Sequence, residues 1–166
     1  GGINLTIVIT APAKEVFRVQ TIHFTGIKEK SPKFDLLQKD DIAFETQESE
    51  NTITIKNGSL TLEISKVPFS MTYYRNGELI TKSTGKDLAL IKTNWKGEYY
   101  EQGDHINTYI RQQLSLGVGE LVYGLGERFT AFIKNGQTVD IWNQDGGTST
   151  EQSYKNIPFY ISNKGY

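Results

Sequence analysis

The residues best suited to chemistry lie close together in the segment Trp142-Asn-Gln-Asp-Gly-Gly147. An indole ring can cover the C–H face of a sugar, while the Asp145 carboxylate and the neighbouring amides can hydrogen-bond to hydroxyl groups. The two glycines free the backbone after Asp145. The same residue types also describe a core tryptophan followed by an Asx-type turn. On residue types alone, the turn is the favoured interpretation.

Other candidate groups give weaker signals. Gly124 and Gly126 have the spacing of a phosphate-binding loop, but a dinucleotide fingerprint requires a following helix. A strand whose glycines allow close backbone packing is therefore favoured. The two histidines, His23 and His105, are far apart, and no Ser-His-Asp set or acid/base carboxylate pair can be assembled. We predict no catalytic residue, no metal site and no cofactor in this chain.

The composition excludes several classes of protein. The 166 residues suit one domain, and the net charge of −1 gives no support for nucleic-acid binding. The absence of cysteine excludes disulfides and thiolate metal sites, and it favours, weakly, a cytoplasmic location. No apolar run approaches the roughly 20 residues of a membrane helix, so no membrane association is expected.

The elements that position these groups are predicted to be strands. Apolar and polar residues alternate along Ile3–Thr10 and Leu60–Ser65, which is typical of strands with one buried face. Asn-Gly pairs favour tight type I′ hairpins. Three such hairpins are predicted, joining Thr52–Lys56 to Ser59–Ser65, Ser70–Arg75 to Glu78–Thr81, and Ala131–Lys134 to Gln137–Trp142.

Two segments fit the strand pattern poorly. Ser31–Asp41 is polar and is expected to hold one helical turn, and Thr84–Asp104 is expected to be irregular. Near the end of the chain, Ile157–Ser162 is predicted to be a strand, with Pro158 tolerated at its start. Short strands at this spacing predict an all-β, antiparallel sandwich.

The segments Tyr123–Phe129, Trp142–Gly147 and Tyr154–Phe159 together resemble the N-terminal β-domain of glycoside hydrolase family 31, particularly in bacterial α-xylosidases. The resemblance implies a galactose-mutarotase-like β-sandwich that occupies residues 1–166 as a single domain, truncated at both ends. It also implies that the catalytic carboxylates belong to a barrel beyond Tyr166, so this chain would lack them.

The resemblance also changes the interpretation of the loop. In the family, the matching loop reaches over the barrel mouth, and its aspartate contacts the sugar beyond the scissile bond. Asp145 and Trp142 are therefore the predicted substrate-binding residues. The Glu127-Arg128 pair, on residue types either a buried ion pair or a solvated one, is expected to be structural, at the seam between the β-domain and the barrel.

The expected function is that of a non-catalytic domain of a retaining α-glycosidase, acting on an oligosaccharide or α-xyloside. Its expected partners are its own catalytic barrel and further copies in a homo-oligomer. Two alternatives remain. A free carbohydrate-binding module would need an aromatic platform that is complete without a barrel. An oligomerisation domain would need an apolar patch on an outer sheet face.

Overall fold

The computed structural model describes residues 4–23, 42–95, 105–141 and 153–166. Over these residues the regular structure consists of strands, and no helix there is long and apolar enough to cross a membrane. The helical turn expected at Ser31–Asp41 lies outside the described residues. The chain divides into two compact units, residues 1–115 and 116–166, which are described separately.

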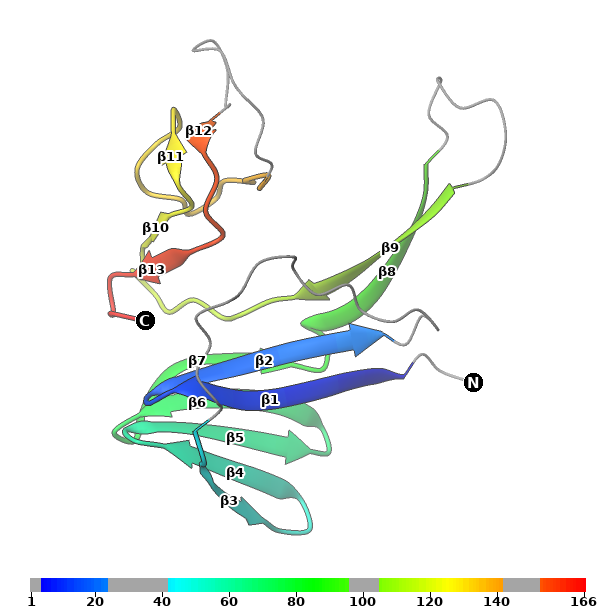
Figure 1. The fold of residues 1–166 in the computed structure, drawn as a ribbon, viewed down its shortest axis with the longest axis vertical. Coiled ribbons are helices and arrows are strands. Elements are labelled where there is room, and N and C mark those ends of the chain that lie inside the picture. Colours follow the sequence, from blue (N-terminus) through cyan, green and yellow to red (C-terminus); the bar gives the residue numbers. More distant parts are fainter. Residues whose placement is uncertain (1–3, 24–41, 96–104, 142–152) are drawn as a thin grey trace. The chain divides into compact units, whose positions relative to one another are not determined.

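The centre of the first unit is a five-stranded antiparallel sheet in which each strand pairs with the next along the chain (Figure 1). Its strands are β3 (Glu45–Glu48), β4 (Thr52–Asn57), β5 (Leu60–Lys66), β6 (Phe69–Arg75) and β7 (Glu78–Thr84). The edge strand β3 has all four residues exposed, and its Glu, Thr and Gln side chains suit an edge that faces water.

Two of the predicted hairpins form, with different turn geometries. At Asn76-Gly77 both residues have positive φ, 50° and 82°, as a type I′ turn requires. At the first hairpin only Gly58 has positive φ, and Asn57 instead pairs with Leu60 inside the ladder. The tight turn is therefore centred one residue later than predicted, on Gly58 and Ser59.

The reason for this shift is a role that Asn57 plays away from its own turn. Its side-chain amide donates to the backbone carbonyls of Ala13 and Val16, at 2.9 and 3.0 Å. These carbonyls belong to the hairpin of β1 (Leu5–Ala13) and β2 (Val16–His23). Asn57 is buried, so its hydrogen bonds tie this hairpin to the sheet.

The hydrophobic core of this unit lies between the hairpin and the sheet. Ile55, Leu62 and Met71 are buried on one face of β4, β5 and β6. The alternating apolar residues of β1 and β2 pack against them: Ile7, Ile9, Phe17 and Val19. The predicted period-two patterns thus produce two apolar faces in contact, which is a sandwich packing.

Part of the segment expected to be irregular, Thr84–Asp104, forms one strand of a long ribbon, and its residues 96–104 lie outside the described residues. Strands β8 (Leu88–Trp95) and β9 (His105–Gln112) pair antiparallel along their whole lengths. The expectation failed because β8 lacks clean polar–apolar alternation. Strand β8 is stabilised by pairing with β9, which begins at His105, just outside the segment Thr84–Asp104.

In its described residues, the second unit contains four short strands in two pairs. β10 (Val122–Gly124) pairs with β13 (Tyr160–Ser162), and β11 (Glu127–Arg128) pairs with β12 (Ser153–Lys155). The predicted strand at Ile157–Ser162 is present in its second half only. In both pairs, a strand from the start of the unit meets one from its end.

The third predicted hairpin does not form over the described residues. Residues 131–141 contain a turn at Asn135-Gly136 but no strand on either side of it. The Asn135 side chain makes other bonds: its amide oxygen accepts from the Val122 N–H at 2.8 Å, and its amide nitrogen donates to the Glu120 carbonyl at 2.9 Å. Asn135 therefore fixes β10 instead of starting a hairpin.

Candidate functional site

In the described part of residues 116–166 the buried residues are polar, and many large apolar residues are exposed. None of the residues that form the buried hydrophobic core belongs to this unit, as far as the structure describes it. Its buried residues are polar: Glu120, Lys134, Ser153, Asn156 and Ser162. This distribution reverses the usual one, in which burial of apolar side chains drives folding.

The exposed apolar residues include several large aromatic rings. Phe132 is 78% exposed, Tyr154 65% and Phe159 62%. Two ring pairs involve these exposed rings: the partly buried Tyr123 with Phe132, and Phe129 with Tyr154, each with centroids 5.1 Å apart. We call the exposed large apolar residues of this unit the aromatic surface: Leu116, Val118, Phe129, Phe132, Ile133, Ile141, Tyr154, Ile157, Phe159, Tyr160 and Ile161.

A tight turn at Gly124-Leu125-Gly126 connects β10 to β11. All three residues have positive φ, at 107°, 68° and 92°. A Cβ atom at Gly124 would lie 2.7 Å from the Phe159 carbonyl oxygen, and one at Gly126 would overlap the Lys155 carbonyl oxygen. The two glycines thus permit close approach of backbone, as the sequence predicted, and no phosphate-binding helix follows them.

Arg128 is the centre of the hydrogen bonding around this turn. Its Nε donates to the Leu125 carbonyl at 3.1 Å. Its guanidinium also donates to the Asp140 carbonyl and to the side-chain oxygen of Asn156, which is buried. One side chain therefore joins three separate stretches of the unit.

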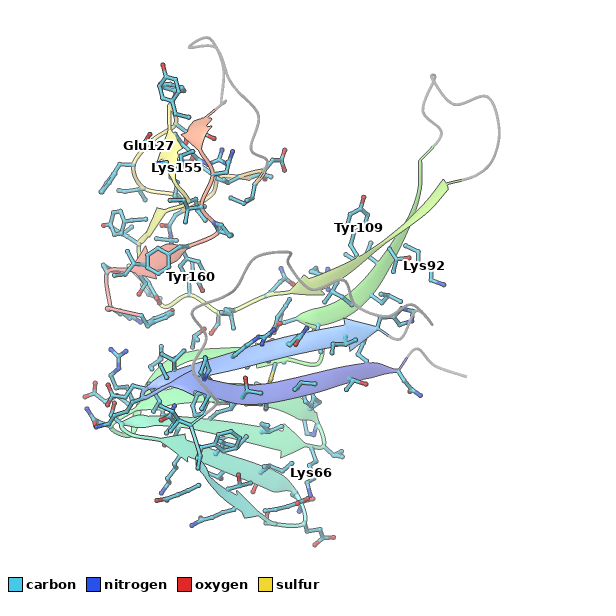
Figure 2. All side chains as sticks on the ribbon, viewed as in Figure 1. Lys66, Lys92, Tyr109, Glu127, Lys155 and Tyr160 are labelled. Atoms are coloured by element: carbon cyan, nitrogen blue, oxygen red, sulfur yellow. The ribbon has the colours of Figure 1, made fainter. Side chains whose placement is uncertain are left out.

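The Glu127-Arg128 pair is not a buried ion pair. Glu127 lies instead 4.0 Å from Lys155 across the β11–β12 ladder, and both side chains are largely exposed (Figure 2). Exposed pairs of this kind add little stability. Adjacent residues on a strand point to opposite faces, which explains why Glu127 faces solvent while Arg128 reaches inward.

Glu120 is the buried carboxylate among the described residues of this unit. Its Oε2 accepts from the Gly117 N–H at 2.6 Å and lies 3.3 Å from the Lys164 Nζ. Burial alone raises the pKa of Glu120. Hydrogen bonds from Tyr166, Gly117, Ser162 and Lys164 outweigh burial and lower the pKa to about 2. Glu120 is therefore a charged structural anchor, unsuited to proton transfer near neutral pH.

Tyr160 shows the effect of this charge on a neighbour. Burial raises the pKa of Tyr160, and the negative charge of Glu120 raises it further. Neither Glu120 nor Tyr160 stood out in the sequence, because their importance depends on the return of the chain end to β10.

The two predicted substrate-binding residues, Trp142 and Asp145, lie outside the described residues. The structure places residues on either side of them. Asp140 and Asn156 both bond to Arg128, and Ser153 is paired with Arg128 in the β11–β12 ladder. The role of Trp142 and Asp145 stays a prediction.

Comparison with known families identifies the chain. Residues 6–166 match the model of the glycosyl hydrolase 31 N-terminal galactose mutarotase-like domain. The chain belongs to this family. The match spans both compact units.

Two relatives are α-xylosidases. The chain is 43% identical over 163 residues to α-xylosidase XylQ of Lactiplantibacillus pentosus, covering 97% of this chain and 20% of that enzyme. It is 38% identical over 173 residues to an α-xylosidase of Emericella nidulans, covering 95% of this chain and 22% of that enzyme. The chain thus spans about a fifth of the length of these relatives.

Solved structures share the fold. A cycloalternan-forming enzyme of Listeria monocytogenes gives a TM-score of 0.69 at 16% identity, over 98% of this chain and 14% of that one. A family 31 dextranase of Flavobacterium johnsoniae gives 0.67 at 23% identity, over 96% of this chain and 19% of that one. The predicted all-β, antiparallel, galactose-mutarotase-like fold is confirmed.

Proposed function

We propose that residues 1–166 act as one domain, the non-catalytic N-terminal domain of a longer retaining α-glycosidase that cleaves terminal α-linked xylose or glucose. The α-xylosidase relatives support this proposal, because the chain corresponds to about a fifth of their length. Retaining enzymes need two carboxylates about 5–5.5 Å apart. In our proposal both lie in a catalytic barrel outside this chain.

The aromatic surface is the observation that carries the proposed role. Burying apolar surface yields about 25 cal/mol per Å², so a folded unit with a polar interior gains much by covering its exposed rings. We propose that the catalytic barrel of the same protein covers them. The domain then braces the barrel, and the barrel supplies the apolar burial that this unit lacks.

Substitution in two contexts tests this bracing role. Phe132→Ser and Phe159→Ser remove exposed rings, so each should change the stability of the isolated chain little. In the complete enzyme each should lower stability by about 1.5–3 kcal/mol, the value of a buried phenylalanine. Leu79→Ser, an exposed apolar residue of β7 in the other unit, is the matched control.

Equal effects of Phe132→Ser in the isolated chain and in the complete enzyme would contradict the bracing role. If the aromatic surface instead joins copies of the chain, the isolated domain would sediment as an oligomer that Phe159→Ser dissociates. That result would favour an oligomerisation module. The homo-oligomer expected from the family resemblance stays a prediction.

We also propose that Asp145 accepts a hydrogen bond from the leaving-group sugar, with Trp142 packed against that sugar. A charge-assisted hydrogen bond contributes roughly 1.5–3 kcal/mol, or about one to two orders of magnitude in kcat/KM. Asp145→Ala should therefore reduce kcat/KM on a disaccharide by that factor more than on an aryl glycoside, whose leaving group lacks those hydroxyls.

Equal losses on both substrates, or a large fall in melting temperature, would identify Asp145 as a structural turn residue. Sugar binding by the isolated chain would support the alternative of a free carbohydrate-binding module. Isothermal titration with xylose and with an α-xyloside measures that binding directly.

A further inference from the structure

The three Asn-Gly pairs are chemically alike, but their surroundings differ. They are Asn57-Gly58, Asn76-Gly77 and Asn135-Gly136. In such a pair the glycine nitrogen can attack the side-chain carbonyl carbon of the asparagine, because no Cβ atom on the glycine obstructs the approach. Asparagine is accordingly a thermolabile residue. Since the residue types are the same at all three pairs, the structure around each pair decides which one reacts.

The first pair is held by burial and by hydrogen bonds. Asn57 is buried, and its amide nitrogen donates to the carbonyls of Ala13 and Val16 at 2.9 and 3.0 Å. Its neighbour Gly58 is crowded, because a Cβ atom there would lie 2.8 Å from the Cγ of Glu15. Attack at Asn57 would require both hydrogen bonds to break and this turn to move away from the β1–β2 hairpin.

The third pair is exposed but tied. The amide oxygen of Asn135 accepts from the Val122 N–H at 2.8 Å, and its amide nitrogen donates to the Glu120 carbonyl at 2.9 Å. Gly136 itself is uncrowded, since a Cβ atom there would meet no atom within 4 Å. The two hydrogen bonds of the side chain therefore hold the Asn135 amide in place without help from burial.

The second pair has neither restraint. Asn76 is exposed, and its side chain makes no hydrogen bond to any residue that the structure describes. Its backbone N–H donates to the Ser59 carbonyl at 2.9 Å, which anchors the main chain only. Arg75 pairs with Glu78 to close the turn, so the Gly77 N–H is not part of the ladder, and a Cβ atom at Gly77 would meet nothing within 4 Å. The Asn76 amide can thus rotate towards the Gly77 nitrogen without breaking a hydrogen bond.

We propose that Asn76 is a modification site at which the folded chain deamidates, with water as the co-reactant, while Asn57 and Asn135 are protected. The Gly77 nitrogen loses its proton to solvent base and bonds to the side-chain carbonyl carbon of Asn76. The amide C–N bond of that side chain breaks, and its nitrogen leaves as ammonia. Water then opens the cyclic imide at either carbonyl. The net change is asparagine plus water to aspartate or isoaspartate plus ammonia.

The two products should affect the β6–β7 hairpin differently. Asp-Gly suits a type I′ turn as Asn-Gly does, so aspartate should preserve the hairpin. Isoaspartate routes the main chain through the side chain and adds a methylene group to the backbone. A two-residue loop cannot take up that length while Arg75 stays paired with Glu78. Modification therefore adds negative charge to every modified chain and loosens the hairpin in those that carry isoaspartate.

Peptide mapping by mass spectrometry tests the proposal in the complete enzyme, incubated at physiological temperature and mildly alkaline pH. Asn76 should deamidate about tenfold or more faster than Asn57 or Asn135, because each of those must first lose two hydrogen bonds. The control is the same enzyme in urea, where unfolding should bring the three rates together. A rate at Asn76 no higher than at the other two, or a difference that persists in urea, would overturn the proposal.

The products test the chemical route. Fragmentation that distinguishes aspartate from isoaspartate should find both at position 76, because the imide opens at either carbonyl. Aspartate without isoaspartate would indicate direct hydrolysis and would overturn the imide route. The matched variant is Asn76→Gln, whose longer side chain would have to close a larger ring. It should abolish the change in this peptide and leave the slow conversion at Asn57 and Asn135 as it was, and conversion that persists in the variant would contradict the assignment to Asn76.

Discussion

Replacing Glu120 with glutamine should destabilise the second unit in a pH-dependent way. The glutamine keeps the size of the side chain but removes the charge that Gly117 and Lys164 contact at 2.6 and 3.3 Å. Because Glu120 is buried, water cannot replace these partners. The charged form of the glutamate is therefore the one that the fold stabilises.

The pKa sets the magnitude of the effect. The pKa of Glu120 falls from the ordinary value of 4.5 to about 2 in the folded chain. At about 1.4 kcal/mol per pKa unit, the stabilisation is on the order of 3 kcal/mol. A lowered folded-state pKa gives stability that is present above pH 4.5 and is lost as the pH falls towards 2.

Urea denaturation at several pH values measures this contribution. Backbone NMR signals of β10 and β13 report the unfolding of this unit by itself. The difference in unfolding free energy between wild type and Glu120→Gln should be on the order of 3 kcal/mol at neutral pH. It should shrink below about pH 4.5 and approach zero near pH 2.

Glu48→Gln provides the control. Glu48 lies 2.7 Å from Lys66, but its side chain is exposed, so water screens the pair and the substitution should change stability little. If the wild-type and Glu120→Gln curves run parallel between pH 5 and pH 2, Glu120 does not have the lowered pKa, and the reasoning is refuted.

Three further outcomes are expected. Asn57→Ala should lower the free energy of unfolding in urea by about 1–3 kcal/mol, because it leaves the Ala13 and Val16 carbonyls without the Asn57 donor. The control is Gln47→Ala on the exposed strand β3. Equal urea midpoints for Asn57→Ala and wild type would contradict the role of Asn57 in joining the hairpin to the sheet. Gly126→Ala should lower the melting temperature strongly, since its Cβ would overlap the Lys155 carbonyl; an unchanged value would show that the β11–β12 contact is looser. The isolated chain should release no 4-nitrophenol from 4-nitrophenyl α-xyloside. A rate of release above that in buffer alone, unchanged after repurification of the chain, would contradict a non-catalytic role.

Local patterns in the sequence predicted those parts of the fold that depend on neighbouring residues. The alternation in β5 and the Asn76-Gly77 turn are settled within a few positions, and both are confirmed. The turn after β4 shifted by one residue because Asn57 bonds to a hairpin more than forty residues away. A local pattern contains no signal for such a bond.

The candidate site was less predictable for the same reason. The resemblance led to the expectation of a structural role for the segment around Arg128, but it did not indicate the partners of Arg128, which come from residues 125, 140 and 156. The buried carboxylate of Glu120 depends on Lys164 and Tyr166, which approach it only after the chain turns back. Residue type alone therefore did not identify either group.

The pairing pattern also determines the order in which the chain can fold. In β3 to β7 each strand pairs with its successor, so this sheet can form as soon as its own residues have been synthesised. In the second unit, Val122 pairs with Ser162 and Glu127 pairs with Lys155. During translation, β10 and β11 must therefore wait for strands made later, and their backbone N–H and C=O groups lack ladder partners until then. A ribosome that stalls within this stretch would display an apolar segment next to a finished sheet, which is the kind of intermediate that chaperones bind.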